Sequence, residues 1–174
     1  MTEILTSDHK YVKVDNLDIT IRPITLNDKA IEADFVHNLS PQAKHERFLG
    51  TIKDLSPSML THLCDIDYVN SMAYLATIIV NGSEKEIGVC RYANDAVEGE
   101  REMAIAVADE HQNKGIETLL IEQLIEQARA SGIKKLVSIE LSTNHIMKTL
   151  AKSLTMDSKP DPDDNRQTIY SITL

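Results

Sequence analysis

The sequence contains no tryptophan and few other aromatic residues, so its hydrophobic core has to be built from aliphatic side chains. Aromatic residues make up 4% of the 174 residues, whereas hydrophobic residues together make up 42%. A chain of this length and composition can bury one sizeable core, which predicts a single globular domain. No apolar run approaches the roughly 20 residues that a membrane-spanning helix requires, so we expect no membrane association.

Cysteine and histidine are too few and too scattered to indicate a metal site. Cys64 and Cys90 are far apart in the chain, and the histidines show no zinc-binding spacing. We expect both cysteines to be buried, reduced and small hydrophobic in character. The first residues lack the basic start and apolar block of a secretory signal, which predicts a cytoplasmic protein.

Basic residues are outnumbered by acidic ones. The chain has 18 Lys and Arg against 27 Asp and Glu, a formal net charge of −9. This balance argues against a general nucleic-acid binder, which would need a basic face. It suits a cationic partner of any size.

The order of residue patterns predicts a mixed α/β (α+β) fold, with a mostly antiparallel central sheet and helices on both faces. Residues 1–16 are expected to form a loose lead-in, and residues 17–174 a single domain. Alternating and β-branched segments predict strands at residues 18–24, 72–80, 87–92, 102–108, 135–141 and 167–174. Apolar stripes and capping residues predict helices at residues 28–39, 41–48, 59–64, 116–131 and 144–154. Turns are expected at 81–83 and 95–99, and an acidic, proline-containing loop at 158–165.

The segment from Glu102 to Glu117 carries the strongest functional signal. It reads as a strand, a short turn, Gly115 and the start of a long helix. Such a layout can present backbone N–H groups to an anion at the N-terminus of the helix. Glu117 departs from this pattern, because its own carboxylate lies in the first helical turn and could occupy the anion site or point outward.

Other motifs occur in a defined order around this segment. They are Ile21-Arg22-Pro23, Leu39-Ser40-Pro41, Arg47-Phe48, Glu102 ten residues before Gln112, and Asn144 at the start of a helix. Over residues 19–174 this order resembles the GNAT superfamily of N-acetyltransferases, and most of all the catalytic domain of bacterial Pat-type protein-lysine acetyltransferases. Three positions depart from the family pattern: Glu117 replaces Gly or Ala, Ala151 replaces a Tyr that Pat-type domains often lack, and Thr155-Met156 replaces Gly-Phe.

The resemblance implies acetyl-CoA as co-substrate and no metal. The turn that would hold its pyrophosphate is Gln112-Asn113-Lys114-Gly115-Ile116-Glu117. Backbone groups of the strand at Ile105, Ala106 and Val107 would bind the pantetheine arm and stabilise the reaction's oxyanion. Asn144 would hydrogen-bond a pantetheine amide, although an ordinary helix N-cap explains this residue equally well.

Glu102 is the candidate general base. At pH 7 only about one in 10³ lysine side chains is deprotonated, so a positioned group must accept the amine proton. On an alternating strand Glu102 shares a face with Ala104, Ala106 and Ala108, which would leave room for a substrate. The alternative is a solvated carboxylate at the start of a strand.

Three functions therefore remain open from the sequence. The first is acetyl transfer from acetyl-CoA to a primary amine, with a protein lysine as the leading acceptor. The second is a degenerate GNAT-fold regulatory or interaction protein that binds acyl-CoA weakly or not at all because of Glu117. The third is acetylation of a small amine. The protein could act as a monomer or a homodimer.

Overall fold

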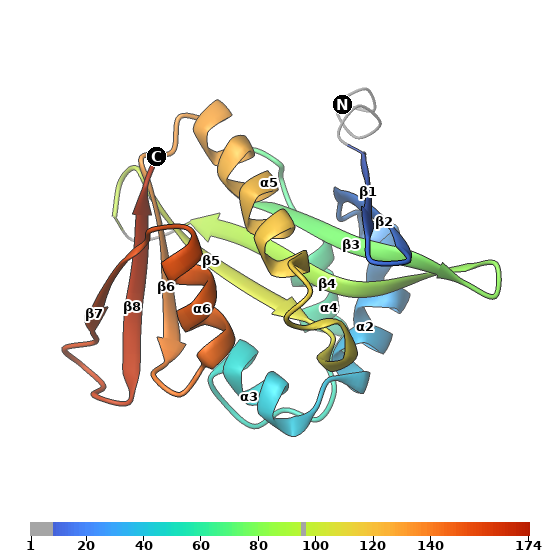
Figure 1. The fold of residues 1–174 in the computed structure, drawn as a ribbon, viewed down its shortest axis with the longest axis horizontal. Coiled ribbons are helices and arrows are strands. Elements are labelled where there is room, and N and C mark those ends of the chain that lie inside the picture. Colours follow the sequence, from blue (N-terminus) through green and yellow to red (C-terminus); the bar gives the residue numbers. More distant parts are fainter. Residues whose placement is uncertain (1–8, 95–96) are drawn as a thin grey trace.

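The computed structural model describes residues 9–94 and 97–174, which form one mixed sheet with helices on both faces (Figure 1). The strand order is β1-β2-β3-β4-β5-β6-β8-β7, and only β5 and β6 are parallel neighbours. The predicted mostly antiparallel sheet is therefore confirmed. In chain order the strands are β1 (Lys10–Val14), β2 (Leu17–Pro23), β3 (Met72–Val80), β4 (Ser83–Asn94), β5 (Glu100–Val107), β6 (Lys135–Leu141), β7 (Asp157–Pro160) and β8 (Gln167–Thr173).

The helices begin where the sequence places capping residues. The Ser40 hydroxyl accepts a hydrogen bond from the Ala43 N–H (3.1 Å), and Ser56 does the same for Met59 (3.2 Å). A proline follows each of these caps, at the first helical position, where its missing N–H costs nothing. In the described part of the chain the helices are α2 (Lys29–Asn38), α3 (Pro41–Phe48), α4 (Pro57–Cys64), α5 (Ile116–Ala130) and α6 (His145–Ser153), with short 3-10 turns η1 (Leu26–Asp28) and η2 (Asp109–His111).

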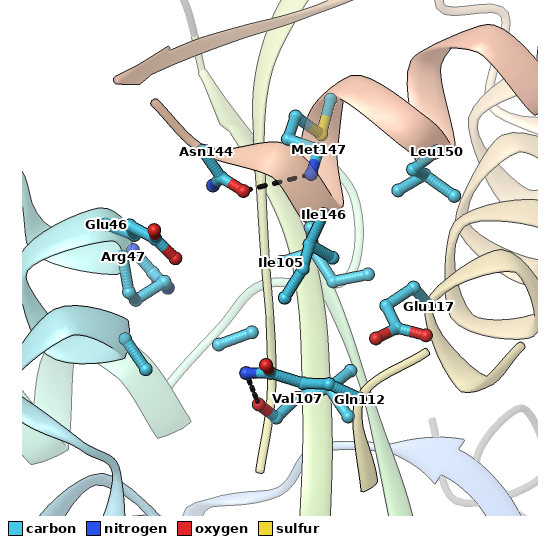
Figure 2. A pocket seen from close by; sticks show the side chains of 12 residues that line it. Glu46, Arg47, Ile105, Val107, Gln112, Glu117, Asn144, Ile146, Met147 and Leu150 are labelled. Atoms are coloured by element: carbon cyan, nitrogen blue, oxygen red, sulfur yellow. Dashed lines mark hydrogen bonds between the residues drawn. The ribbon is translucent and has the colours of Figure 1, made fainter. Parts of the chain in front are cut away.

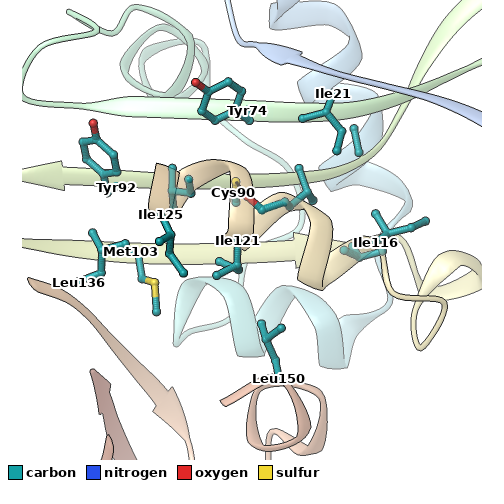
Figure 3. Packing of buried hydrophobic residues seen from close by; sticks show 14 of the residues in the cluster. Ile21, Tyr74, Cys90, Tyr92, Met103, Ile116, Ile121, Ile125, Leu136 and Leu150 are labelled. Atoms are coloured by element: carbon teal, nitrogen blue, oxygen red, sulfur yellow. Dashed lines mark hydrogen bonds between the residues drawn. The ribbon is translucent and has the colours of Figure 1, made fainter. Parts of the chain in front are cut away.

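Each face of the sheet carries its own hydrophobic cluster. Helices α5 and α6 cover one face, where Leu124 and Leu150 pack with strand residues such as Ile21 and Tyr74 (Figures 1 and 3). Helices α2, α3 and α4 contribute to the second cluster, on the other face. The cores are largely aliphatic, as the scarcity of aromatic residues predicted. No helix in the described part of the chain has the length and apolar character needed to cross a membrane.

Gly88 on β4 allows α5 to pack closely against the sheet. A Cβ atom at this position would lie 3.1 Å from Leu120 Cδ1 and 3.2 Å from Val107 Cγ2, tighter than ordinary contacts. The Cys90 thiol, two residues further along the strand, donates to the Leu120 carbonyl (3.2 Å). The first turns of α5 are thus held directly over β4 and β5.

The predicted loose lead-in is wrong for its last residues. Strand β1 pairs antiparallel with β2 along its whole length, joined by a turn in which Asp15 has φ +52°. Val12 and Val14 are half-buried against the first cluster, whereas Lys10, Tyr11 and Lys13 are exposed. Tyr11, Val12 and Val14 make three of its five residues apolar, and Val12 and Val14 alternate around Lys13, a short strand signal that the prediction overlooked. Residues 1–8 of the lead-in lie outside the described residues.

The predicted acidic loop is also wrong at its start. Strand β7 pairs antiparallel with β8 although all four of its residues are exposed. Its order comes from backbone hydrogen bonds to β8 rather than from buried side chains, so no hydrophobic pattern marks it. The turn predicted at 95–99 falls partly on residues 95–96, which lie outside the described residues.

Candidate active site

The two parallel neighbours β5 and β6 separate after a short contact. Only three residue pairs join them, the last being Glu102 with Val137. Strand β5 runs on to Val107 and β6 to Leu141 with no further pairing between them. The sheet is therefore forked at this point, and the fork opens beside α3, α6 and the start of α5 (Figure 1).

A cavity that is open to solvent lies in the fork. Its walls come from β5, the turn before α5, and helices α3, α5 and α6 (Figure 2). Six of the residues predicted to bind the co-substrate line it together: Ile105, Ala106, Val107, Gln112, Glu117 and Asn144. The strand, the turn and a helix some 30 residues later thus converge on one space.

The remaining predicted residues lie around this cavity rather than in its lining. Asn113 and Gly115 border a second hollow, between α5 and α6. Ile116 is fully buried in the first hydrophobic cluster, so only its backbone can contribute to the turn. Lys114 is exposed. Glu117 borders both hollows and therefore stands at their junction.

The side chain of Glu117 points inward. It is only 6% exposed, and its Oε1 accepts a hydrogen bond from the Asn113 backbone N–H at 3.1 Å. Asn113 (φ +60°) and Gly115 (φ +85°) both adopt left-handed backbone conformations, which shape the turn. The Glu117 side chain therefore turns toward the backbone of the turn instead of pointing outward, and anion binding by the turn stays a prediction.

Gln112 fastens the turn to the end of β5. Its Nε2 donates to the Val107 carbonyl oxygen at 3.0 Å. The side chain is half-buried and lines the cavity. Because this bond spans only five residues, it fixes the turn relative to the strand edge that forms one wall of the fork.

Asn144 acts as the N-cap of α6, the alternative role weighed for it from the sequence. Its Oδ1 accepts from the Met147 N–H (3.0 Å), and its Nδ2 donates to Glu140 Oε2 (3.2 Å). Nδ2 carries a second hydrogen, so capping does not use up the amide's donors. A contact with the co-substrate remains a prediction.

Glu140 is a buried carboxyl behind the cavity that the sequence interpretation did not single out. The Ser138 hydroxyl donates to its Oε1, and burial raises its pKa to about 7. In β6 the residues at 136, 138 and 140 are buried and alternate with less buried ones. A Glu and a Ser on the buried side of an alternating strand are the signal that would have identified this pair.

We expect Glu140→Gln to change the pH dependence of stability. A pKa raised from 4.5 to about 7 means that the folded state holds this proton more tightly than the unfolded state. The free energy of unfolding should therefore fall by about 3 kcal/mol as pH rises from ~4.5 to ~7. Urea unfolding of both proteins at pH 5 and pH 8 measures it, and the variant should gain stability relative to wild type at pH 8. Equal differences at both pH values would contradict the assignment.

Glu102 lies where the fork begins, and its side chain is exposed. The predicted alternation holds: Ala106 and Ala108 pack with the second cluster, while Met103 and Val107 belong to the first. Glu102 therefore faces the α3 side of the sheet. It does not belong to the lining of the cavity.

Helix α3 contributes three residues to the cavity that were not predicted as site residues, namely Ala43, Glu46 and Arg47. Glu46 and Arg47 both line it, and Arg47 lies over the Phe48 ring with its Cζ 4.9 Å from the ring centroid. The Arg47-Phe48 pair was recognised only as a sequence motif. Nothing in the local sequence indicates that α3 meets the fork, since this contact joins segments about 60 residues apart.

Single carboxylates such as Glu46 and Glu117 line the cavity without forming a metal-binding cluster. Across residues 9–94 and 97–174, no three His, Cys, Asp or Glu side chains come together so as to hold a metal ion.

Comparison with known proteins defines the class. A family model described as an acetyltransferase (GNAT) domain matches residues 18–157, most of the chain. An acetyltransferase of Pseudomonas aeruginosa is 38% identical over 160 residues, covering 92% of this chain and 86% of that protein. The fold, the forked sheet and these matches define an enzyme that transfers acetyl groups. The chain belongs to the GNAT family of acetyltransferases, which use acetyl-CoA as co-substrate.

Solved structures agree with this fold. The GNAT domain of Streptomyces lividans Pat superposes with a TM-score of 0.85 at 23% identity, covering 97% of this chain and 98% of that one. A GNAT-family acetyltransferase from Streptococcus pneumoniae gives a TM-score of 0.72 at 18% identity, covering 90% and 99%. The first of these matches agrees with the Pat-type resemblance recognised in the sequence.

Proposed function

We propose that this enzyme acetylates a primary amine, with a protein lysine as acceptor and Glu102 as general base. The observation that carries the proposal is the convergence of β5, the turn and α6 on one cavity at the fork. When bound, acetyl-CoA supplies the acetyl group as an activated thioester. The residues of this chain then have to bind its arm, orient it and remove the amine proton.

Strand β5 and the turn are suited to hold the co-substrate. Ile105, Ala106 and Val107 lie beyond the last pair with β6, so the fork leaves this edge of β5 without a neighbouring strand. An extended amide-containing arm could add to such an edge through backbone hydrogen bonds. Gln112 and Asn144 would orient it with side-chain amides, while Asn113 to Glu117 would face the pyrophosphate.

The position of Glu102 supports a role toward the acceptor. It faces the α3 side of the sheet, whereas the turn and α5 lie on the other face. An amine entering from the α3 side would therefore meet Glu102 before reaching the fork. The exposed carboxylate can accept the amine proton directly or through one water molecule.

The acceptor is tested by incubating the protein with acetyl-CoA and lysine-containing peptides, with a polyamine and an aminoglycoside as small-amine probes. We expect CoA release and a mass increase of one acetyl group on the peptides. Acetylation of the small amines alone would overturn the protein-lysine assignment. Failure with every acceptor, while acetyl-CoA binds, would overturn the proposed activity on these amine classes.

A second candidate function is favoured by the inward position of Glu117. Its carboxylate already accepts the Asn113 N–H, a group that the pyrophosphate would need. A GNAT-fold protein with this contact could bind acyl-CoA weakly and act through a protein partner. The affinity for acetyl-CoA separates the two candidates.

A further inference from the structure

Arg47 brings to the cavity a positive charge that no direct contact neutralises. The side chain is half-buried, yet it makes no hydrogen bond or ion pair with any residue that the structure describes. By contrast, four other arginines donate to carboxylate or carbonyl oxygens: Arg22, Arg91, Arg101 and Arg166. The guanidinium lies over the Phe48 ring, and its N–H groups stay available to an oxygen acceptor from a ligand.

The position of Arg47 assigns it to the acceptor rather than to acetyl-CoA. Figure 2 shows Arg47 and Glu117 approaching the cavity from opposite sides, with Ile105 between them. Glu117 belongs to the turn expected to hold the co-substrate, whereas α3 packs on the other face of the sheet. The guanidinium therefore meets a molecule that enters the fork from the α3 side.

Acidic groups near Arg47 do not satisfy its donors. Glu46 lines the same cavity but accepts from Gln42 Nε2 (3.0 Å). The charges of Glu32, Glu140 and Glu102 favour the charged guanidinium, while nearby Arg91 opposes it. Burial outweighs the acids and lowers the pKa of Arg47 to about 10, so at neutral pH it stays charged.

The cavity is thus lined by a carboxylate and a guanidinium that do not pair with each other. Glu46 and Arg47 are consecutive residues, and both line the space. An ammonium group is attracted to Glu46 and Glu102, and a carboxylate fits the planar fork of Arg47 through two parallel hydrogen bonds. A molecule with both groups a short distance apart matches this arrangement.

We propose that Arg47 binds a carboxylate of the acceptor, so that the enzyme selects amines that carry a carboxylate close to the reacting nitrogen. This inference rests on the proposed acetyl transfer and names its substrate class. The carboxylate can come from an acidic residue beside a lysine in a peptide or from a free amino acid, and the test separates these sources.

The kinetic arm compares acceptors that differ in a single charge. Lys-Glu is paired with Lys-Gln in otherwise identical capped peptides, and lysine is paired with lysinamide. For wild type we expect kcat/KM to favour the carboxylate member of at least one pair by about 10-fold or more, since charge-assisted bonds contribute roughly 1.5–3 kcal/mol. Preference within the peptide pair points to a protein acceptor, and preference within the lysine pair to an amino acid.

Variants identify Arg47 as the source of this preference. In Arg47→Gln the ratio within each pair should fall to about one, chiefly through a higher KM for the carboxylate acceptor. Arg47→Lys should keep part of the preference, because it keeps the charge without the planar fork. Arg129→Gln, which removes an exposed arginine at the far end of α5, is the matched control and should retain the full ratio.

A binding arm does not depend on turnover. The Arg47 Nε–H resonance, identified by its loss in Arg47→Lys, should shift when N-acetylglycine is added to wild type and should not shift with N-acetylglycinamide. Equal responses to both probes would overturn the inference even if the protein is an active acetyltransferase. A selective shift without any acetylation would keep the carboxylate site and count against the proposed function.

Two kinetic outcomes would also overturn the inference. One is an equal kcat/KM for the charged and amide acceptors in wild type. The other is a uniform loss of kcat for all acceptors in Arg47→Gln with a changed pH profile. That result would mean that Arg47 serves a nearby carboxyl such as Glu102 or Glu140 instead.

Discussion

Glu102→Gln is expected to lower kcat by about 10²–10⁴, the usual contribution of a positioned general base. Glutamine keeps the size and hydrogen-bonding reach of the side chain but cannot accept the amine proton. Because the proton moves in the transition state, kcat and kcat/KM should fall together, while the affinity for acetyl-CoA stays unchanged. Initial rates of CoA release with a lysine peptide, together with calorimetric titration of acetyl-CoA, measure both quantities.

Two matched variants show whether a loss of kcat is specific to Glu102. Glu98→Gln removes another exposed carboxylate from the same stretch of chain and should leave kcat unchanged. Glu140→Gln removes the buried carboxyl behind Asn144. If Glu102→Gln keeps full activity and Glu140→Gln loses it, the base is Glu140 and the assignment of Glu102 is wrong.

Glu117→Gln is expected to tighten acetyl-CoA binding by about a hundredfold. Two unit charges ~6 Å apart at an effective dielectric of ~20 repel by roughly 3 kcal/mol before salt screening. Glutamine can still accept the Asn113 N–H through its carbonyl oxygen, so the turn keeps its shape while losing the competing charge. Dissociation constants from calorimetry at low and high salt test this, and the difference between the proteins should shrink as salt rises.

A control ligand tests whether repulsion between Glu117 and the pyrophosphate weakens binding. S-acetylpantetheine lacks the pyrophosphate, so its affinity should be the same for wild type and Glu117→Gln. Melting temperatures provide a second readout, because a ligand at ~100 times its dissociation constant adds about 2.7 kcal/mol to stability. Equal acetyl-CoA affinity in both proteins would mean that Glu117 swings outward on binding, and it would remove the basis for the interaction-protein alternative.

The sequence predicted those parts of the fold and of the site that depend on residues close together in the chain. The Ser-Pro caps marked α3 and α4, although α4 begins at Pro57, two residues before the predicted helix, and the apolar stripe after Gly115 predicted α5. The segment from Glu102 to Glu117 was recognised as a unit because strand, turn and helix follow one another directly. Five predicted residues of this segment, together with Asn144, line one cavity.

Longer-range features could not be obtained in this way. Strand β7 has no buried side chain, so hydrophobic periodicity did not mark it, whereas β1 carries only the short alternation Val12-Lys13-Val14, which was overlooked. The contribution of Arg47 depends on how α3 packs against the fork, and the direction of Glu117 depends on the fold of the turn. The sequence left open whether Glu117 points into the turn or outward. The hydrogen bond from the Asn113 N–H to its carboxylate shows that it points inward.

Strand β7 also bears on how the protein behaves at high concentration. It is the outermost strand at one end of the sheet, and it carries Asp157, Lys159 and Pro160 with all side chains exposed. Proline has no N–H to offer another strand, and charged side chains disfavour docking of a second sheet edge. This end of the sheet therefore resists growth by strand addition, and chains that meet there are directed away from aggregation.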